Sequence, residues 1–235
     1  TWLDWLKKLP DELIRTRPVL SAQYAGALLN VGELEASESR LRDAEQWLEP
    51  DIGEVPKREN LSDRMVVIDE DQLRTLPANI AICRAQIALA QGDVPGTVNQ
   101  AELALKLSPK DSQVNSQASV LLGLTYWGNG DLETAHDFMS EWVNNMEKSG
   151  NIYFSIAATF GLADIRIAQG RLSEAERTYK HSLQLASEQE ENVQWITAHH
   201  QLGLAMIYHE KVEHENFEKH MLKSEELGRK TTLID

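Results

Sequence analysis

The chain has little cysteine, no long apolar run and fewer basic than acidic residues. Its single cysteine, Cys83, has no partner for an internal disulfide, and no basic-then-apolar leader opens the sequence. Both features favour a reducing, cytosolic setting over a secreted fold held by disulfides. No apolar run approaches the roughly 18 residues that a membrane span requires. These absences predict a soluble cytoplasmic protein that makes no membrane contact.

Basic residues are outnumbered, because 23 Lys and Arg stand against 37 Asp and Glu in 235 residues, for a net charge of −14. An acidic field of this size repels phosphate backbones. The sequence also lacks the Gly-x-x-x-x-Gly-Lys-Ser/Thr motif that cradles a nucleotide phosphate. We therefore expect no direct nucleic-acid contact and no cofactor in this segment. The first residue is Thr1 rather than Met, which suggests a fragment of a longer protein.

The most informative feature that is present is a repeat. A glycine followed two residues later by an aliphatic residue occurs four times, and a small residue stands seven positions before and five positions after each glycine. These glycines are Gly32, Gly92, Gly130 and Gly170. A fifth copy, which has lost its glycine, surrounds Val212. A period of about 40 residues is typical of repeat architectures built from helix pairs.

Each unit of the repeat reads as two antiparallel helices. The sequence before each glycine is apolar almost all round, whereas the sequence after it is apolar on one side only. The first helix of a pair is therefore the inner one, and the glycine ends it in the left-handed conformation. We predict an all-α fold, a right-handed superhelix of tetratricopeptide-like helix pairs, which forms a single domain over residues 1–235.

Proline marks the borders of the predicted helices. Pro18 and Pro77 are placed in first helical turns, and Pro50 and Pro109 follow outer helices. An irregular insertion over 51–71 fills the longer first repeat, and its 65–68 stretch is the only strand-like part of the chain. The helices that we expect are 3–8, 18–31, 34–48, 77–91, 95–107, 111–129, 132–149, 152–169, 172–189, 193–209 and 214–227.

Two sets of residues carry a family resemblance. The first set, Gly123, Tyr126, Gly130, Asp131 and Ala135, resembles the tetratricopeptide pattern. The second set comprises segments 5–14, 17–20, 28–34 and 163–172, with Trp5-Leu6-Lys7-Lys8-Leu9-Pro10 and Ala163-Asp164-Ile165-Arg166 among them. These segments resemble the helical-repeat region of the large ATP-binding LuxR-type transcription regulators of the MalT-like group. The resemblance covers nearly the whole chain and is weakest over 51–71 and after Val212.

This resemblance implies a function. In that family the repeats lie between a nucleotide-binding module of the STAND type and a helix-turn-helix, neither of which is in this sequence. It implies a non-catalytic sensor and interaction domain that binds a small-molecule inducer or a regulatory protein and controls oligomerisation and DNA binding by the parent protein. Self-association is a further implied contact, and ATP would bind only the parent's missing module. The alternative is a generic tetratricopeptide-like scaffold for a peptide or protein partner.

Residues with catalytic or metal-binding chemistry form no motif. His209 and His214 are five residues apart, rather than the four that place two zinc ligands on one helix face. No serine has a histidine and an acid whose convergence the sequence suggests. Cys83 lies in an inner-helix pattern that is typical of a small buried hydrophobe. We therefore expect no enzyme activity and no metal site.

The repeat geometry places residues six and three positions before each turn glycine on the concave face. From these we take Gln86, Trp127 and Asp164 as candidate ligand contacts, the first and last for directional hydrogen bonds and Trp127 for stacking. Asp164 interrupts an apolar helix and could instead form an internal ion pair with Arg84 or Arg166. Trp127 could instead be a core residue, which is the more common role of a tryptophan in such a pattern. The remaining tryptophans, Trp2, Trp5, Trp47, Trp142 and Trp195, fit apolar stripes and are predicted to lie in the core.

Overall fold

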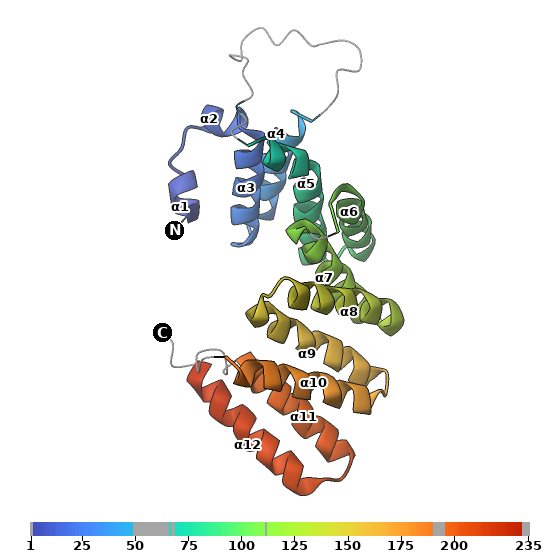
Figure 1. Ribbon diagram of the computed structural model, residues 1–235. Helices are drawn as coiled ribbons and strands as arrows, with labels where there is room; N and C mark the ends of the chain where they lie inside the picture. Colours follow the sequence, from blue (N-terminus) through green and yellow to red (C-terminus); the bar gives the residue numbers. More distant parts are fainter. Residues whose placement is uncertain (1, 49–65, 67–68, 111, 190–195, 232–235) are drawn as a thin grey trace. The chain divides into compact units, whose positions relative to one another are not determined.

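A computed structural model describes the chain except for residues 1, 49–65, 67–68, 111, 190–195 and 232–235 (Figure 1). The described part contains twelve α-helices and no strand. They are α1 (Trp2–Leu6), α2 (Asp11–Arg15), α3 (Pro18–Leu29), α4 (Leu34–Glu45), α5 (Glu70–Ala90), α6 (Val94–Leu107), α7 (Gln113–Gly128), α8 (Leu132–Lys148), α9 (Ile152–Ala168), α10 (Leu172–Ser187), α11 (Ala198–Glu210) and α12 (His214–Thr231). The predicted all-α, helical-repeat fold class is confirmed.

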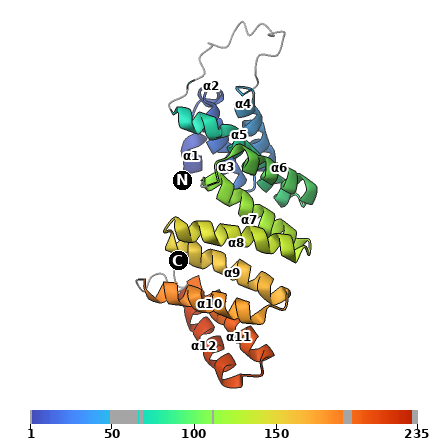
Figure 2. The ribbon, with the colours of Figure 1, turned by 45° about the vertical axis from the view of Figure 1, so that its right-hand side comes forward.

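The helices form two compact units, which are Thr1–Thr125 (unit 1) and Tyr126–Asp235 (unit 2). In unit 1, α3 pairs with α4, α5 pairs with α6, and α3 packs on α5, while α1 and α2 lie against α3. In unit 2, α9 packs against both α8 and α10, and α11 pairs with α12. Figures 1 and 2 show the helices of unit 2 running back and forth in chain order. In each pair the helix before the turn carries more buried residues than the helix after it, as in α5 with eight and α6 with three, so the helices before the turns are the inner ones.

Most helix pairs are joined by a turn in the left-handed backbone region. At the end of α5, Gly92 has a φ of 75° and its N–H donates to the carbonyl of Leu89 at 3.0 Å. The corresponding φ values are 80° at Gly32, 85° at Gly130 and 75° at Gly170. In the last pair Val212 has a φ of 60°, although a β-branched residue is disfavoured there. The predicted glycine register is confirmed, including its fifth copy.

The small residues of the repeat lie where the two helices of a pair approach each other. They are fully buried on both sides of the turn, at Ala25, Ala85, Ala163, Ser37, Thr97, Ala135 and Ala175. In the first pair the Ser37 hydroxyl donates to the backbone carbonyl of Ala25 at 2.9 Å, so a polar contact joins α3 to α4. Small side chains allow this close packing of helices.

The predicted start of the helix at Pro77 is wrong. This helix, α5, begins at Glu70, and Pro77 lies inside it. Its N-cap is Asp69, whose carboxylate accepts the backbone N–H of Asp71 at 2.9 Å and that of Gln72 at 3.3 Å. A side-chain cap and an acidic first turn stabilise a helix start, which offsets the backbone hydrogen bond that a proline removes. The prediction also misses the short helix α2.

The predicted insertion over 51–71 and the first residues of the helix predicted from Val193 lie largely outside the described residues. Val66, in the strand-like stretch, belongs to no strand, and its N–H donates to the carbonyl of Thr16 at 3.0 Å. The described helix of the last repeat begins at Ala198.

Two of the tryptophans predicted to be core residues are at the surface. Trp2 and Trp5 are 54% and 52% exposed and stack on each other, with ring centroids 5.2 Å apart. The reason is that α1 has only five residues and buries only Leu6. Trp47 and Trp142 are partly buried, and Trp195 lies outside the described residues.

Candidate functional site

A groove with a volume of about 340 Å³ runs over the inner helices of unit 1. It is lined by thirteen residues, most of them from α3 and α5, and none of the thirteen is charged. Six are carboxamides, Gln23, Asn30, Gln72, Asn79, Gln86 and Gln117. We call this feature the carboxamide groove. Because neutral polar groups dominate its lining, the groove offers hydrogen bonds rather than charge to a ligand.

The carboxamides recur at intervals of seven residues along two packed helices. Gln72, Asn79 and Gln86 follow this spacing on α5, and Gln23 and Asn30 follow it at α3 and its C-cap. Seven residues are close to two helical turns, which keeps successive side chains on one face about 10 Å apart. The two helices therefore present parallel rows of amide groups to the groove.

Most of these amides are unused by the protein itself. The side chains of Gln23, Asn30, Gln72, Gln86 and Gln117 make no hydrogen bond within the part of the chain that is described. Asn79 differs, because its Nδ2 donates to the carbonyl of Thr75 at 3.1 Å and to the Thr75 hydroxyl oxygen at 3.3 Å. This leaves the Asn79 Oδ1 as an acceptor.

A glycine lies between the two carboxamides of α3. Gly26 is inside a helix, where glycine is less stable than alanine by roughly 1 kcal/mol. A Cβ atom added at Gly26 would meet no heavy atom within 4 Å, so the packing of α3 does not require a glycine there. Its effect is to leave the backbone of α3 open to the groove.

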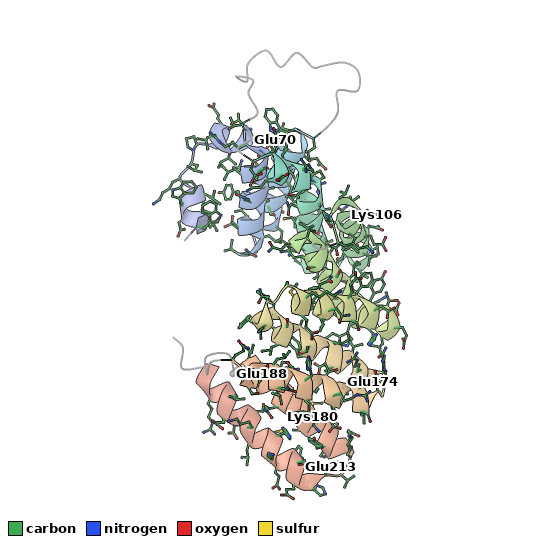
Figure 3. All side chains as sticks on the ribbon, viewed as in Figure 1. Glu70, Lys106, Glu174, Lys180, Glu188 and Glu213 are labelled. Atoms are coloured by element: carbon green, nitrogen blue, oxygen red, sulfur yellow. The ribbon has the colours of Figure 1, made fainter. Side chains whose placement is uncertain are left out.

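The electrostatic character of the groove contrasts with that of the outer helices. Burial raises the pKa of the Cys83 thiol to about 11, so this lining side chain is neutral as well. Figure 3 shows charged side chains on outer helices, such as Lys106 on α6 in unit 1 and Glu174 and Lys180 on α10 in unit 2. The groove is an uncharged part of an acidic protein.

Asp164, on α9 in unit 2, has two polar partners. It accepts a hydrogen bond from the Tyr179 hydroxyl, and its Oδ2 lies 3.1 Å from Nε2 of His199. The ring of Phe160 packs against the ring of His199 with centroids 4.9 Å apart. The Asp164 side chain is 25% exposed and that of His199 is 48% exposed. This carboxylate is therefore paired and remains partly open to solvent.

Two adjacent histidines on α11 have opposite pKa shifts. The hydrogen bond to Asp164 raises the pKa of His199, whereas burial lowers the pKa of His200 to about 4. His200 is fully buried, and its Nε2 lies 2.9 Å both from Thr159 Oγ1 and from the carbonyl oxygen of Ile156. At neutral pH His200 is therefore an uncharged member of the core.

The two arginines considered as partners of Asp164 pair elsewhere. Arg84 binds Glu45 through two hydrogen bonds of 2.7 Å, and it also contacts Glu38 at 3.2 Å. Arg166 donates to the Thr178 hydroxyl. The expectation of an arginine partner is wrong, because a residue on the neighbouring inner helix α11 reaches the carboxylate instead.

The three predicted contact residues have different surroundings. Gln86 lines the carboxamide groove in unit 1. Trp127 belongs to unit 2 and packs, partly buried, against a cluster that includes Met139 and Leu162. Asp164 also belongs to unit 2, in the pairing described above. Sequence reasoning missed the other five carboxamides of the groove, although the seven-residue spacing of four of them, Gln23, Asn30, Gln72 and Asn79, was a usable signal.

The described part of the chain contains no group of three or more His, Cys, Asp or Glu side chains arranged to hold a metal ion. None of the described helices has the length and apolar character needed to cross a membrane.

Comparison with protein families gives one match, since a family model described as the MalT-like TPR region matches residues 78–234. No curated protein shows a significant match.

Several solved structures have the same fold. BtubC (BKLC) from P. vanneervenii is 14% identical with a TM-score of 0.69, over 92% of this chain and 81% of that one. A putative kinesin light chain from Podosopora anserina with nearly identical TPR-like repeats is 14% identical with a TM-score of 0.64, over 91% and 95%. MamA AMB-1 is 18% identical with a TM-score of 0.55, over 91% and 99%. At these identities the likeness establishes the helical-repeat fold alone.

Proposed function

Because this chain belongs to the MalT-like TPR region family, we propose that it is the sensor and interaction domain of a bacterial MalT-like transcription regulator. In this proposal the domain is non-catalytic and cytoplasmic, and it binds an inducer or a regulatory protein. Occupancy then controls oligomerisation and DNA binding by the parent protein, whose ATP and DNA sites lie outside this segment.

The carboxamide groove is the observation that carries the proposal. Its lining combines an open volume of about 340 Å³ with five side-chain amides that have no partner within the described protein. Free amides on a surface of packed helices are suited to bind a ligand with directional hydrogen bonds. Gln86, the candidate contact in unit 1, lies within this set.

Three residues of unit 2 are candidate contacts for a protein partner in this proposal. Asp164 and His199 offer a partly exposed ionic pair beside the ring of Phe160, and Trp127 offers the exposed part of its indole. We propose them as contacts for a regulatory protein or for another copy of the chain.

Sensing requires that the ligand bind two arrangements of the domain with different affinity. In a helical-repeat protein each helix pair contacts mainly its neighbours, so a ligand that bridges successive inner helices changes the relation between adjacent pairs. The carboxamide groove spans α3 and α5 of unit 1, which belong to successive pairs. In this proposal, a ligand bound in the groove changes how α3 and α5 pack against each other.

A first experiment is to read the coding sequence on both sides of this segment. The proposal expects a nucleotide-binding module before Thr1 and a helix-turn-helix after Asp235. A complete protein with neither would contradict the regulator function and leave the interaction scaffold.

A second experiment tests sensing in the complete protein. Its self-association is followed by sedimentation velocity with a panel of neutral oligosaccharides and short peptides. We expect at least one probe to change the mass of the assembly, Gln86→Leu to raise the probe concentration needed, and Asn99→Leu, a matched change at an exposed carboxamide of α6, to leave it unchanged. An assembly that responds to no probe would contradict the proposal.

A further inference from the structure

We infer that a groove on the outer face of unit 1 docks an amphipathic helix of a partner protein, one whose aliphatic stripe is flanked by a basic residue. The groove has a volume of about 370 Å³ and lies over α5, between the C-terminal end of α4 and the side of α6. We call it the outer groove. Its lining residues are Glu45, Leu48, Pro77, Ile80, Ala81, Arg84, Gln100, Leu103 and Leu107.

The outer groove and the carboxamide groove lie on opposite sides of α5 and share no lining residue. A helix turns by about 100° per residue, so Pro77, Ile80 and Arg84 lie on one face of α5. That face is rotated by roughly 140° from the face that carries Asn79 and Gln86. The inference therefore concerns a second surface and does not depend on the proposed function.

The α6 side of the outer groove is more apolar than the repeat requires. Leu103 and Leu107 are 42% and 46% exposed, and they are neighbours on the helix surface because they are four residues apart. Leu103 stands eleven residues after the turn glycine Gly92. The residues eleven positions after the other three turn glycines are Asp43, Glu141 and His181. An exposed leucine at this position is therefore a feature of α6 and not of the repeat.

Two charged residues of the lining depart from the repeat in the opposite sense. Glu45 stands thirteen residues after Gly32, and Arg84 stands eight residues before Gly92. The residues at the positions equivalent to Glu45 are Leu105, Val143 and Leu183, and those at the positions equivalent to Arg84 are Tyr24, Leu122 and Leu162. An ion pair thus stands where the other glycine-marked repeats have apolar or aromatic side chains. Three positions that break the repeat pattern lie together in one groove.

The ion pair brings an excess of carboxylate to the α4 side of the groove. Arg84 binds Glu45 through two hydrogen bonds of 2.7 Å and also contacts Glu38 at 3.2 Å, so one guanidinium serves two carboxylates. Arg42 also reaches Glu38, but it is mostly exposed, and a surface pair of this kind contributes little. The hydrogen bond from Arg84 holds the pKa of the Glu45 carboxyl below its usual value. Glu45 is therefore ionised at neutral pH.

This charge favours a basic residue on the partner. The Glu45 side chain is partly exposed, so its oxygens can accept a further charge-assisted hydrogen bond from lysine or arginine. Lys106, which precedes Leu107 on α6, does not line the groove (Figure 3). The net charge of −14 also favours a basic partner over an acidic one.

A helix fits this lining better than an extended chain does. Gln100 is the only neutral side chain with a hydrogen-bonding group among the described lining residues. An extended peptide would find few partners there for its backbone, whereas a helix satisfies most of its own backbone groups. From Pro77 to Arg84 the floor of the groove extends about 10 Å along α5, which is two helical turns. Side chains at positions i, i+4 and i+7 of the bound helix would cover this length.

The test begins with a selection against the chain of residues 1–235. Helical peptides of about 18 residues, randomised on one face, are displayed on phage, and the best binder is synthesised for calorimetry. We expect the randomised face to converge on aliphatic residues three or four positions apart, with a lysine or arginine beside them. A selection that yields no binder, or only binders without a basic residue, would overturn the inference.

Substitutions in the chain identify the surface that the peptide occupies. Leu103→Asn should weaken binding about tenfold or more, because it removes an apolar contact of the groove. Leu222→Asn is the matched control at an exposed leucine of α12, and it should stay within about twofold of the original affinity. Both leucines are exposed, so neither change should lower the melting temperature by more than a few degrees. Weaker binding by Gln86→Leu with none by Leu103→Asn would place the peptide in the carboxamide groove and overturn the inference.

The charged contact is tested with a double-mutant cycle. Replacing the basic residue of the peptide by glutamine should weaken binding to the original chain about three- to fivefold. The same replacement should have little effect on binding to Glu45→Gln, in which Arg84 keeps Glu38 as a partner. Equal losses with both chains would show that Glu45 is not the partner of the basic residue and would contradict the assignment.

Further measurements separate this inference from other occupants and from the proposed function. Self-association of the chain of residues 1–235 in sedimentation velocity that Leu103→Asn abolishes would mean that a second copy fills the groove, and it would overturn the choice of a partner helix. A helix that binds the outer groove, in a complete protein whose assembly responds to no probe, would contradict the sensor function and leave this inference intact. An assembly that responds to a probe, with no helix bound at the outer groove, would do the reverse.

Discussion

The buried imidazole of His200 makes unit 2 sensitive to mild acid. Its ring is fully buried between α9 and α11, and burial lowers its pKa from 6.5 to about 4. Because the folded-state pKa is below the unfolded one, the unfolded state binds a proton first. The stability that this group contributes is fully present above pH 6.5 and is lost as the pH falls towards 4.

The size of the effect follows from the two pKa values. Between pH 7 and pH 5 the unfolded chain protonates this histidine and the folded chain does not, which costs about 2 kcal/mol of unfolding free energy. His199 acts in the opposite direction, since its raised pKa contributes stability at low pH that is lost as the pH rises through its folded value. The contribution of His200 must therefore be isolated by substitution.

The assay is urea denaturation at pH 7, 6 and 5, for the original protein and for His200→Gln, with His214→Gln as a control at an exposed position. The variant at 200 begins from a lower stability because a fully buried side chain is replaced, but its free energy of unfolding should fall less steeply as the pH is lowered. Nuclear magnetic resonance titration should give His200 a pKa below 5 and His199 one above 6.5. Parallel pH profiles for the original protein and His200→Gln would refute the reasoning.

Two other predictions concern unit 2. Gly203→Ala should destabilise the protein by about 1–3 kcal/mol, because the new Cβ would lie 2.3 Å from Cζ of the buried Tyr179; an unchanged Tm would contradict this. Asp164→Asn should lower the pKa of His199 measured by resonance titration but cost less than about 1 kcal/mol, because the imidazole is half exposed. A loss as large as that for a buried ion pair would show that the pairing is stronger than its exposure indicates.

The sequence predicted the helices best where two signals coincide. The helix predicted over 152–169 is α9 (Ile152–Ala168), and the one predicted over 172–189 is α10 (Leu172–Ser187). In these helices, the helical spacing of apolar residues and the position of the turn glycine indicate the same borders. At Pro77 a single signal was misleading, because a proline that is compatible with a first turn lies within α5, whose start depends on the Asp69 cap.

The site was harder to predict than the helices. A row of Gln and Asn with seven-residue spacing on one helix resembles an ordinary solvated face. It lines a groove because α3, which contributes Gly26 to the lining, packs beside α5, and that packing is tertiary information. The partner of Asp164 was missed for the same reason, since His199 is 35 residues away on another inner helix.

The central claim is that the free carboxamides of unit 1 bind the ligand. The most direct measurement is the nuclear magnetic resonance spectrum of side-chain amides in protein labelled with ¹⁵N at Gln and Asn, recorded while the oligosaccharide or short peptide that changes the assembly of the complete protein is added. The account predicts shifts for the side-chain NH₂ signals of Gln72, Asn79 and Gln86 and none for Asn99. A saturating probe that shifts only signals from unit 2, and leaves those three unchanged, would contradict it.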